Sequence, residues 1–384
     1  MDKKVGVAKT NQTFKILSVF GILFVVLGHC RKIGVFFSDV FPFYCFHMAL
    51  FAFISGYFYK DRKPSEFLKT KCRKLLIPYF VWNLIYGFIL YLLKYYKIVG
   101  FGRSFNLFNI FIAPFYGSSN QFVFNVASWF VISIFFVQLI YYLIHQISKK
   151  IVKKPKIGIE IILLIISFII AFFWIKNFNA DYKYGFNYLI TRIIFLMPFY
   201  CVGQVYKRFE NRIHIEGKYT YIFFGIIILS QTVLLAKVPS FTYNLQTLSF
   251  KSNYVIYFIG SLIGIMFWLK ISKILAKYIT SSHIIDAIGN NTFSIMMHHV
   301  FSIFLMNTVI YMIHVTTGLF SKFDVRSYQK SFFYFYSKNP GLILIYVIVG
   351  VSLPLIGNHF YWKIKPKVIN KLQIIMKKRS NQSS

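Results

Sequence analysis

Acidic residues are scarce in this sequence. Its 384 residues include 10 Asp and Glu against 44 Lys and Arg, for a formal net charge of +34, and only 14% are charged. A soluble domain carries about 25% charged residues. Since 57% of the residues are hydrophobic and 21% aromatic, the chain is too apolar for a nucleic-acid-binding protein or a disordered basic segment. The composition predicts a polytopic membrane protein with cations in its loops and no nucleic-acid partner.

Cysteine is also rare. The four cysteines, Cys30, Cys45, Cys72 and Cys201, do not have metal-ligand spacing, so the sequence predicts no metal site. Cys30 and Cys45 flank one predicted hairpin, and the sequence leaves open whether they form a disulfide or stay as thiols. There is no repeat of fixed period, low-complexity tract or linker to divide the chain into several domains.

Long apolar runs fill most of the chain. A transmembrane helix needs about 20 predominantly apolar residues, and ten stretches have roughly this character: Phe14–His29, Pro42–Tyr59, Leu75–Leu93, Ser128–His145, Gly158–Ile175, Tyr184–Val205, Tyr219–Ala236, Asn253–Leu269, Thr292–Ile313 and Gly341–Trp362. The stretch 105–124 is apolar but interrupted by Asn, Pro and Gly, which favours a re-entrant or interfacial segment. The sequence predicts an all-α bundle of about ten transmembrane helices.

The cations alternate between the two sides of this predicted bundle. Segments on the side of the amino terminus carry 30 Lys and Arg, and segments on the opposite side carry 13. By the positive-inside rule, we expect both termini to be cytoplasmic. The first apolar run is not followed by a small-residue cleavage site, so we expect it to be an uncleaved span. We expect one integral domain in the cell membrane over residues 1–362, followed by a basic cytoplasmic tail over 363–384.

The few acids avoid the predicted spans. All ten lie in loops or at helix ends, so there is no ladder of carboxylates of the kind that proton-driven pumps use. This absence argues against an ion-coupled transporter. The polar groups at membrane depth are mainly histidines and one arginine: His29, His47, His298, His299 and Arg192.

His29 and His47 are predicted to lie at similar depth. His29 is about 15 residues into the first span, which is roughly 20 Å from its cytoplasmic start. His47 comes early in the second span, which descends from the outside. A neutral imidazole can exchange a proton in a site of low dielectric constant. Alternatively, each histidine only forms a hydrogen bond between helices, and the sequence leaves both interpretations open.

Several blocks of the sequence resemble the membrane acyltransferase-3 family. The opening blocks are Gly21–His29 (GILFVVLGH), Phe46–Tyr57 (FHMALFAFISGY) and the basic stretch Phe67–Tyr79 (FLKTKCRKLLIPY). Weaker matches follow at Ser128–Phe130 and Ile288–His299. The blocks occur in the family's order, and the first three together are specific, whereas each alone is a weak signal.

The resemblance implies transfer of an acyl group, usually acetyl, from cytoplasmic acyl-CoA to an acceptor outside the cytoplasm. Acceptors in this family include capsule, O-antigen, exopolysaccharide and other envelope glycans. His29 matches the family's first-span histidine, which is thought to be catalytic, and His47 matches the histidine of the Phe-His-Met block. His299 matches a late-helix histidine better than His298 does, and it is expected to contact the acceptor or the oxyanion.

The resemblance also implies a binding site for the donor acyl-CoA. Lys71, Arg73 and Lys74 match the family's basic stretch, and such cations pair well with phosphates. Their alternative role is to fix the topology and contact anionic lipid. The family often has Arg or Lys eleven residues before the first histidine, where this chain has Ser18; Lys15, one helical turn away, is the expected substitute.

Arg192 and Trp129 are the remaining candidates for binding. Arg192 lies inside a span, so it needs a partner or a wet cavity. The sequence is compatible with an acceptor or oxyanion contact and also with hydrogen bonds to backbone carbonyls. Trp129 lies near the predicted outer face, where aromatic residues stack on sugars or, alternatively, form an interfacial belt.

Taken together, these residues and the family resemblance predict an inner-membrane O-acyltransferase. The donor is expected to be acyl-CoA, most simply acetyl-CoA, with no bound cofactor and no metal. The acceptor is a hydroxyl of a surface polysaccharide or of its lipid-linked precursor, and His29 acts as base or acyl carrier. The alternatives are a flippase or exporter of glycans or lipids without this chemistry, and a structural membrane partner. The sequence predicts no particular oligomeric state.

Overall fold

The computed structural model is built from helices. It describes residues 3–30, 41–117, 122–151, 158–179, 185–213, 215–238, 241–337 and 339–380. Within these ranges, the only β-type pairing is an isolated antiparallel bridge between Asn244 and Ser249. The prediction of an all-α polytopic fold is therefore confirmed.

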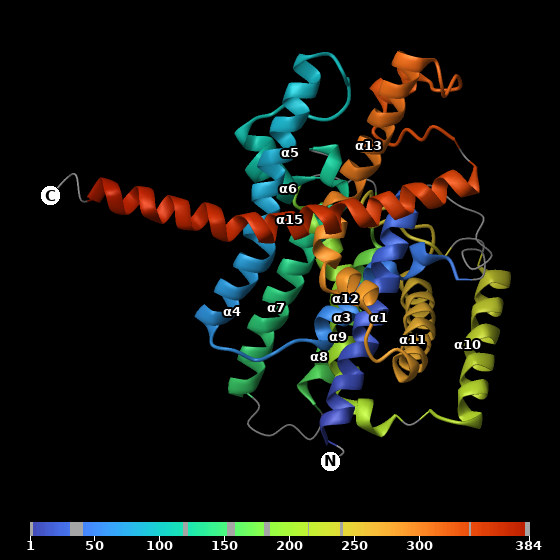
Figure 1. Ribbon diagram of the computed structural model, residues 1–384. Helices are drawn as coiled ribbons and strands as arrows, with labels where there is room; N and C mark the ends of the chain where they lie inside the picture. Colours follow the sequence, from blue (N-terminus) through green and yellow to red (C-terminus); the bar gives the residue numbers. More distant parts are fainter. Residues whose placement is uncertain are drawn as a thin grey trace.

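Long helices account for most of the described chain (Figure 1). They are α1 (Lys3–His29), α5 (Ile77–Tyr95), α7 (Trp129–Ile151), α8 (Ile159–Lys176), α9 (Asn187–Phe209), α10 (Lys218–Lys237), α11 (Tyr254–Tyr278), α13 (Thr292–Thr317) and α15 (Pro340–Ser380). The shorter elements are η1 (Phe43–Cys45), α3 (His47–Tyr57), α4 (Pro64–Lys71), η2 (Cys72–Leu76), η3 (Phe108–Ile112), α6 (Ala113–Tyr116), η4 (Val123–Ser128), η6 (Glu210–Arg212), α12 (His283–Asn290) and α14 (Val325–Lys330).

Nine helices of the described chain are long and apolar enough to cross a membrane, and each coincides with one of the ten predicted spans. The second predicted span, Pro42–Tyr59, is shorter than expected. Its helix α3 has 11 residues, or roughly 16 Å at 1.5 Å per residue, about half the thickness of the hydrocarbon core. The span is shortened because Pro42 is extended, η1 is a 3₁₀ turn, and Phe46 interrupts the helix with φ −145° and ψ −20°.

The stretch 105–124 does not form a long helix in its described part. Before η4 begins at Val123, its helical elements are the five-residue π-helical turn η3 and the four-residue α6. Both pack against longer helices, η3 on α5 and α6 on α7 and α9. These short elements agree with the expectation of a re-entrant or interfacial segment.

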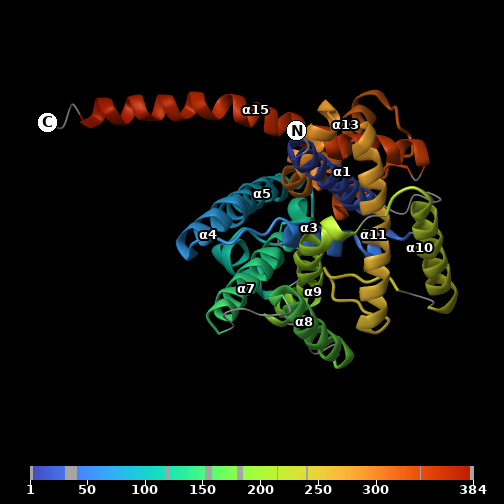
Figure 2. The same ribbon diagram turned by 90° about the horizontal axis from the view of Figure 1, so that it is seen from below.

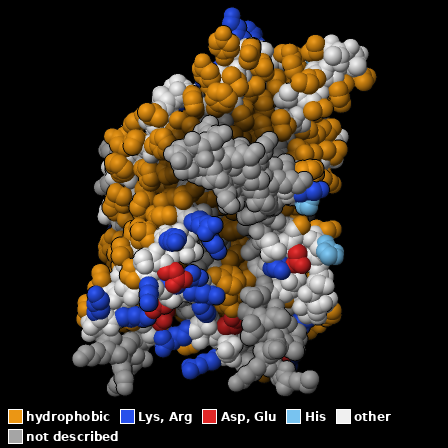
Figure 3. Space-filling model, turned by 60° about the vertical axis from the view of Figure 1, so that its left-hand side comes forward, with side chains coloured by type: hydrophobic (Ala, Val, Ile, Leu, Met, Phe, Trp, Pro, Cys, Tyr) orange, Lys and Arg blue, Asp and Glu red, His pale blue; other side chains and the backbone are white. Residues whose placement is uncertain are grey.

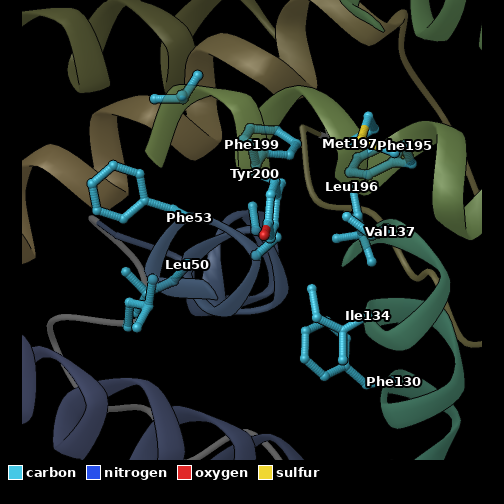
Figure 4. Close-up of a cluster of buried hydrophobic side chains, with 14 of the residues drawn as sticks. Leu50, Phe53, Phe130, Ile134, Val137, Phe195, Leu196, Met197, Phe199 and Tyr200 are labelled. Atoms are coloured by element: carbon cyan, nitrogen blue, oxygen red, sulfur yellow. The ribbon is translucent and has the colours of Figure 1, made fainter. Parts of the chain in front are cut away.

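The short helix α3 lies at the centre of the bundle. Figure 2 shows it enclosed by longer helices, and it contacts α1, α7, α9 and α11. In Figure 4, Leu50 and Phe53 of α3, Phe130 of α7 and Tyr200 of α9 lie in one buried apolar cluster. A helix too short to span the membrane is therefore held by packing against four longer helices.

Two glycines bring the backbones of α3 and α9 together. A Cβ atom on Gly56 of α3 would collide with the carbonyl of Tyr200, and a Cβ atom on Gly203 of α9 would collide with the carbonyl of Phe53. Small residues at helix interfaces allow this close approach in membranes, where packing replaces the hydrophobic effect as the driving force.

The last helix, α15, crosses the bundle. Figures 1 and 2 show it running across the direction of α1 and α13, and it packs on α13 with further contacts to α1 and α12. At Gly350, a Cβ atom would lie 3.1 Å from Val26 Cγ1 and 3.7 Å from His299 Cβ, so α15 covers the back of this histidine. The helix continues past Trp362 through the basic tail to Ser380.

Ion pairs connect the segments that were predicted to share the cytoplasmic side. The six pairs among the described residues are Lys15–Asp286, Arg62–Glu66, Lys149–Asp61, Arg208–Glu160, Lys273–Glu210 and Lys277–Glu216. Figure 3 shows most charged side chains gathered toward one end, below a largely hydrophobic surface. We call the end that holds these six pairs the charged end.

The charged end is predicted to face the cytoplasm. Ser65 lies beside the basic stretch of this end, whereas Thr316 lies at the carboxyl end of α13, and both are exposed. In a Cys72→Ser background, we expect Thr316→Cys to react with a membrane-impermeant maleimide in intact cells. Ser65→Cys should react only after the cells are opened. Labelling of Ser65→Cys in intact cells would contradict the predicted orientation.

The close contact between α3 and α9 is predicted to make Gly203 intolerant of substitution. Gly203→Ala should lower the free energy of unfolding of the purified protein in detergent by about 1–3 kcal/mol, because the added methyl group meets backbone that cannot move aside. Its melting temperature should fall accordingly. Gly225 of α10 is the matched control, since a Cβ atom there meets nothing within 4 Å. Gly225→Ala should leave stability unchanged or raise it. Equal melting temperatures for Gly203→Ala and the parent protein would contradict this packing.

Candidate active site

A cavity of about 700 Å³ lies between α1, α3, α7 and α13 and is bordered by the turn 243–247. Small-molecule sites commonly have volumes of about 300–1,000 Å³. Most of the wall is apolar, and polar side chains from Ser55, Gln138 and Thr292 interrupt it. His29, His47 and Trp129, three of the residues singled out from the sequence, line this one cavity.

His29 is the last residue of α1. The Tyr44 hydroxyl of η1 donates a hydrogen bond to the carbonyl of the adjacent Gly28, which fixes this helix end against η1. Gly28 permits the contact because a Cβ atom there would lie 3.2 Å from the Tyr44 hydroxyl and 3.3 Å from the Phe43 ring. The His29 imidazole therefore projects into the cavity from an anchored position.

His47 is the first residue of α3. Its Nδ1 atom lies 2.6 Å from the Phe43 carbonyl oxygen. Since a carbonyl only accepts hydrogen bonds, Nδ1 carries the proton, and a neutral His47 then has its lone pair on Nε2. The interruption of the helix at Phe46 thus has a consequence for chemistry, because η1 supplies the carbonyl that selects this tautomer.

His299 of α13 lies directly behind His29. The two ring centroids are 4.9 Å apart, and the Phe333 ring stacks on His29 at 5.8 Å. Nδ1 of His299 lies 2.9 Å from the Ile295 carbonyl oxygen and 3.0 Å from that of Met296. Its Nε2 is buried and has no hydrogen-bond partner among the described residues.

The neighbouring His298 points elsewhere. Its Nδ1 is hydrogen-bonded to the Tyr86 hydroxyl at 2.7 Å, and its ring meets Trp82 edge-on at 4.2 Å. Consecutive residues of a helix are about 100° apart around its axis, so only one of the two histidines can face α1. The structure brings His299 to His29, while His298 joins α13 to α5.

Arg192 lies behind Trp129. Its side chain is 2% exposed, and its guanidinium carbon stands over the rings of Trp129 at 4.7 Å and Tyr188 at 5.2 Å. Nε donates to the Leu245 carbonyl at 2.9 Å, and a terminal nitrogen donates to the Gln246 carbonyl at 2.6 Å. Arg192 is not among the residues that line the cavity, but Leu245 and Gln246 are.

The predicted basic residues lie toward the charged end. Arg73 and Lys74 are exposed on η2 and form no ion pair within the described chain, and the Lys71 ammonium stands 5.6 Å from the centre of the Phe67 ring. Leu75 lines the cavity, so the basic stretch ends at its wall. Lys15 differs from these cations because it is paired with Asp286 at 2.7 Å.

No metal ligands assemble in the part of the chain that the structure describes. No group of three or more His, Cys, Asp or Glu side chains there is placed to hold an ion. Cys30 and Cys45, for which the sequence left a disulfide open, are both buried free thiols. The polar chemistry of the cavity therefore comes mainly from imidazoles, amides and hydroxyls.

Comparison with known protein families assigns the chain to one of them. The model of the acyltransferase-3 family, described as an acyltransferase domain, matches residues 14–359. The chain belongs to this family. No curated protein and no solved structure gives a significant match. The match extends from the start of the first predicted span to the last one, so it includes every helix around the cavity.

The cavity of this acyltransferase-3 protein combines features that acyl transfer needs. Transfer to a hydroxyl requires a base or a nucleophile at the reacting carbonyl and hydrogen-bond donors for the developing oxyanion. His29 and His47 offer two imidazoles in a mostly apolar enclosure, and Ser55, Gln138 and Thr292 offer hydroxyl and amide donors. A mostly apolar wall lowers the local dielectric constant and so strengthens these interactions.

The sequence did not indicate several residues of this site. Phe333 stacks on His29, yet aromatic residues are too abundant in this chain for it to stand out. The turn 243–247 lies in a predicted outer loop that has no periodic pattern. Only the short Asn-Leu-Gln-Thr polar interval at Asn244 could have drawn attention to it.

Filling the cavity is predicted to abolish activity without unfolding the acyltransferase. Ser55 lines the cavity from α3, so Ser55→Phe should occupy the space needed by substrates and lower acyl transfer by at least about 100-fold. Thr232→Phe, on the exposed surface of α10, is the matched control and should retain activity. Acyl transfer is measured in membranes that contain equal amounts of each protein. Full activity of Ser55→Phe would show that reaction occurs elsewhere.

Proposed function

We propose that this protein is an integral O-acyltransferase of the cell membrane. It transfers an acyl group, most simply acetyl, from cytoplasmic acyl-CoA to a hydroxyl of a surface polysaccharide or its lipid-linked precursor. The observation that carries this proposal is the convergence of His29 and His47 on one cavity from separate helices. A pair of imidazoles in one apolar cavity suits proton transfer between a hydroxyl and a thioester.

His47 is suited to act as a base or proton carrier in this reaction. Because its Nδ1 proton is donated to Phe43, the neutral ring has an unprotonated Nε2. That nitrogen can accept a proton from the acceptor hydroxyl or later protonate the leaving thiolate. His29 can take the base role instead, or carry the acyl group covalently on one ring nitrogen.

His299 is suited to orient His29. Its Nδ1 is placed against two backbone carbonyls, so the neutral ring has its lone pair on Nε2, which is buried and lacks a described partner. A modest rotation of either ring would let a His29 N–H donate to this nitrogen, since the ring centroids are 4.9 Å apart. The other His29 nitrogen would then be unprotonated. This geometry favours a positioning role for His299 over direct contact with the acceptor.

The donor is proposed to approach from the charged end. Arg73 and Lys74 are exposed and unpaired among the described residues, so they can bind the CoA phosphates without breaking an ion pair. Lys15 is less suited to this role, because Asp286 already neutralises its charge. Leu75 connects the basic stretch to the cavity, which gives the pantetheine thioester a short path to the histidines.

The test compares acyl esters on the surface glycan of wild-type, deletion, His29→Ala and His47→Ala cells. Removal of a general base or nucleophile lowers a rate by about 100-fold or more, so we expect alkali-labile acyl groups to be lost in all three altered strains. His283→Ala is the matched control, because His283 is exposed at the start of α12. It should retain wild-type acylation.

Protein levels must be equal for this comparison to hold. Full acylation in the His29→Ala strain would overturn the catalytic assignment. A deletion strain that fails to display the glycan at all would favour the alternative function of glycan export.

A further inference from the structure

The turn 243–247 forms part of the cavity wall, although it comes from the loop between α10 and α11. It is closed by two backbone hydrogen bonds between Asn244 and Ser249, of 3.1 and 2.9 Å. The Asn244 side chain accepts from the backbone N–H groups of Gln246 and Thr247 at 2.9 and 3.1 Å, as in an Asx turn. Asn244 and Thr247 are exposed, whereas Leu245 is buried, so the turn offers polar groups to the cavity and anchors itself by an apolar one.

Arg192 holds this turn from behind. Its guanidinium donates to two successive carbonyls, those of Leu245 and Gln246, and is enclosed by the rings of Trp129 and Tyr188. A buried arginine is costly unless its donors are satisfied. The planar fork of the guanidinium suits two adjacent acceptors, which a lysine could not bind in the same way.

The turn is also connected to the histidines. The Tyr243 hydroxyl is hydrogen-bonded to Ser261 Oγ at 3.2 Å, and Ser261 donates to the Cys45 carbonyl at 2.5 Å. Cys45 belongs to η1, which supplies the Phe43 carbonyl to His47. The position of the turn is therefore fixed relative to the proposed reacting groups.

Backbone strain lies directly after the turn, between the paired residues Asn244 and Ser249. Leu248 has φ +50°, in the left-handed region that a bulky side chain rarely adopts, and it is completely buried. Such strain costs of order 1–3 kcal/mol and persists only where surrounding contacts hold it, commonly at ligand-binding sites. Here those contacts come from the Asn244–Ser249 pairing and from Arg192.

We infer that the turn 243–247 recognises the acyl acceptor and that Arg192 is a positioning residue that holds it in place. The turn offers amide and hydroxyl groups without charge, and Trp129 lines the cavity near it. These groups suit an uncharged sugar ring that presents several hydroxyls. The inference rests on the proposed function, and it makes acceptor binding separable from the reaction with acyl-CoA.

The test uses the full-length protein in proteoliposomes. The substrates are acetyl-CoA and de-O-acylated surface polysaccharide purified from the host cells. Two quantities are measured: the KM for polysaccharide, and the rate of acetyl-CoA hydrolysis without polysaccharide. Thr247→Val removes one hydroxyl from the cavity wall and leaves the backbone of the turn intact. Arg192→Met removes the two hydrogen bonds from the guanidinium to the turn, and Arg192→Lys keeps the positive charge without the planar fork. Arg212→Met, on the exposed surface of η6, is the matched control.

We expect Arg192→Met to raise the KM for polysaccharide about tenfold or more, because two hydrogen bonds from a charged group are lost. Thr247→Val should raise the same KM severalfold, Arg192→Lys should lie between Arg192→Met and wild type, and Arg212→Met should match wild type. Arg212→Met should also leave acetyl-CoA hydrolysis unchanged, whereas Thr247→Val and Arg192→Met should affect the KM for polysaccharide more than they affect this hydrolysis. Because Thr247→Val retains the hydrogen bonds between Arg192 and the turn, it tests the inference even if Arg192→Met does not fold.

Two negative results have separate meanings. If the wild-type protein transfers acetyl groups and Thr247→Val leaves the KM for polysaccharide unchanged, the assignment of the turn is overturned. If the wild-type protein transfers no acetyl group to any polysaccharide, the proposed function itself has failed.

Discussion

The three-residue turn η1 is the constraint on which the candidate site depends. Its Phe43 carbonyl accepts a hydrogen bond from His47 Nδ1, its Tyr44 hydroxyl donates one to the carbonyl of Gly28 beside His29, and its Cys45 carbonyl accepts one from Ser261 of α11. Three successive residues thus connect α1, α3 and α11 around the cavity. In a membrane interior, where water does not satisfy backbone groups, irregular chain of this kind persists only where it is buried in protein or lines a cavity.

The fold places its polar groups where lipid does not meet them. Arg192 is enclosed by aromatic rings and carbonyls, and His299 is covered by α15 at Gly350. The ion pairs stay at the charged end, away from the hydrophobic surface. The cavity wall therefore combines apolar side chains with two imidazoles and a polar turn.

Much of this arrangement could be predicted from the sequence. Nine of the ten expected spans are long helices, since apolar length is a direct consequence of bilayer thickness. His29 and His47 could be singled out because polar groups are costly in lipid. The length of α3 could not be predicted, because a 3₁₀ turn such as η1 has the same apolar composition as a helix. Nor could the partner of Arg192, a backbone turn more than 50 residues away in sequence, leave any compositional signal.

The proposed function requires that acyl groups pass from one side of the membrane to a hydroxyl on the other through the cavity of His29. Inverted membrane vesicles test it directly, with labelled acetyl-CoA added outside and de-O-acylated polysaccharide enclosed within. We predict alkali-labile label on the enclosed polysaccharide of wild-type vesicles, and none above background with His29→Ala. Equal labelling in both preparations, or no labelling in either, would contradict the proposed function.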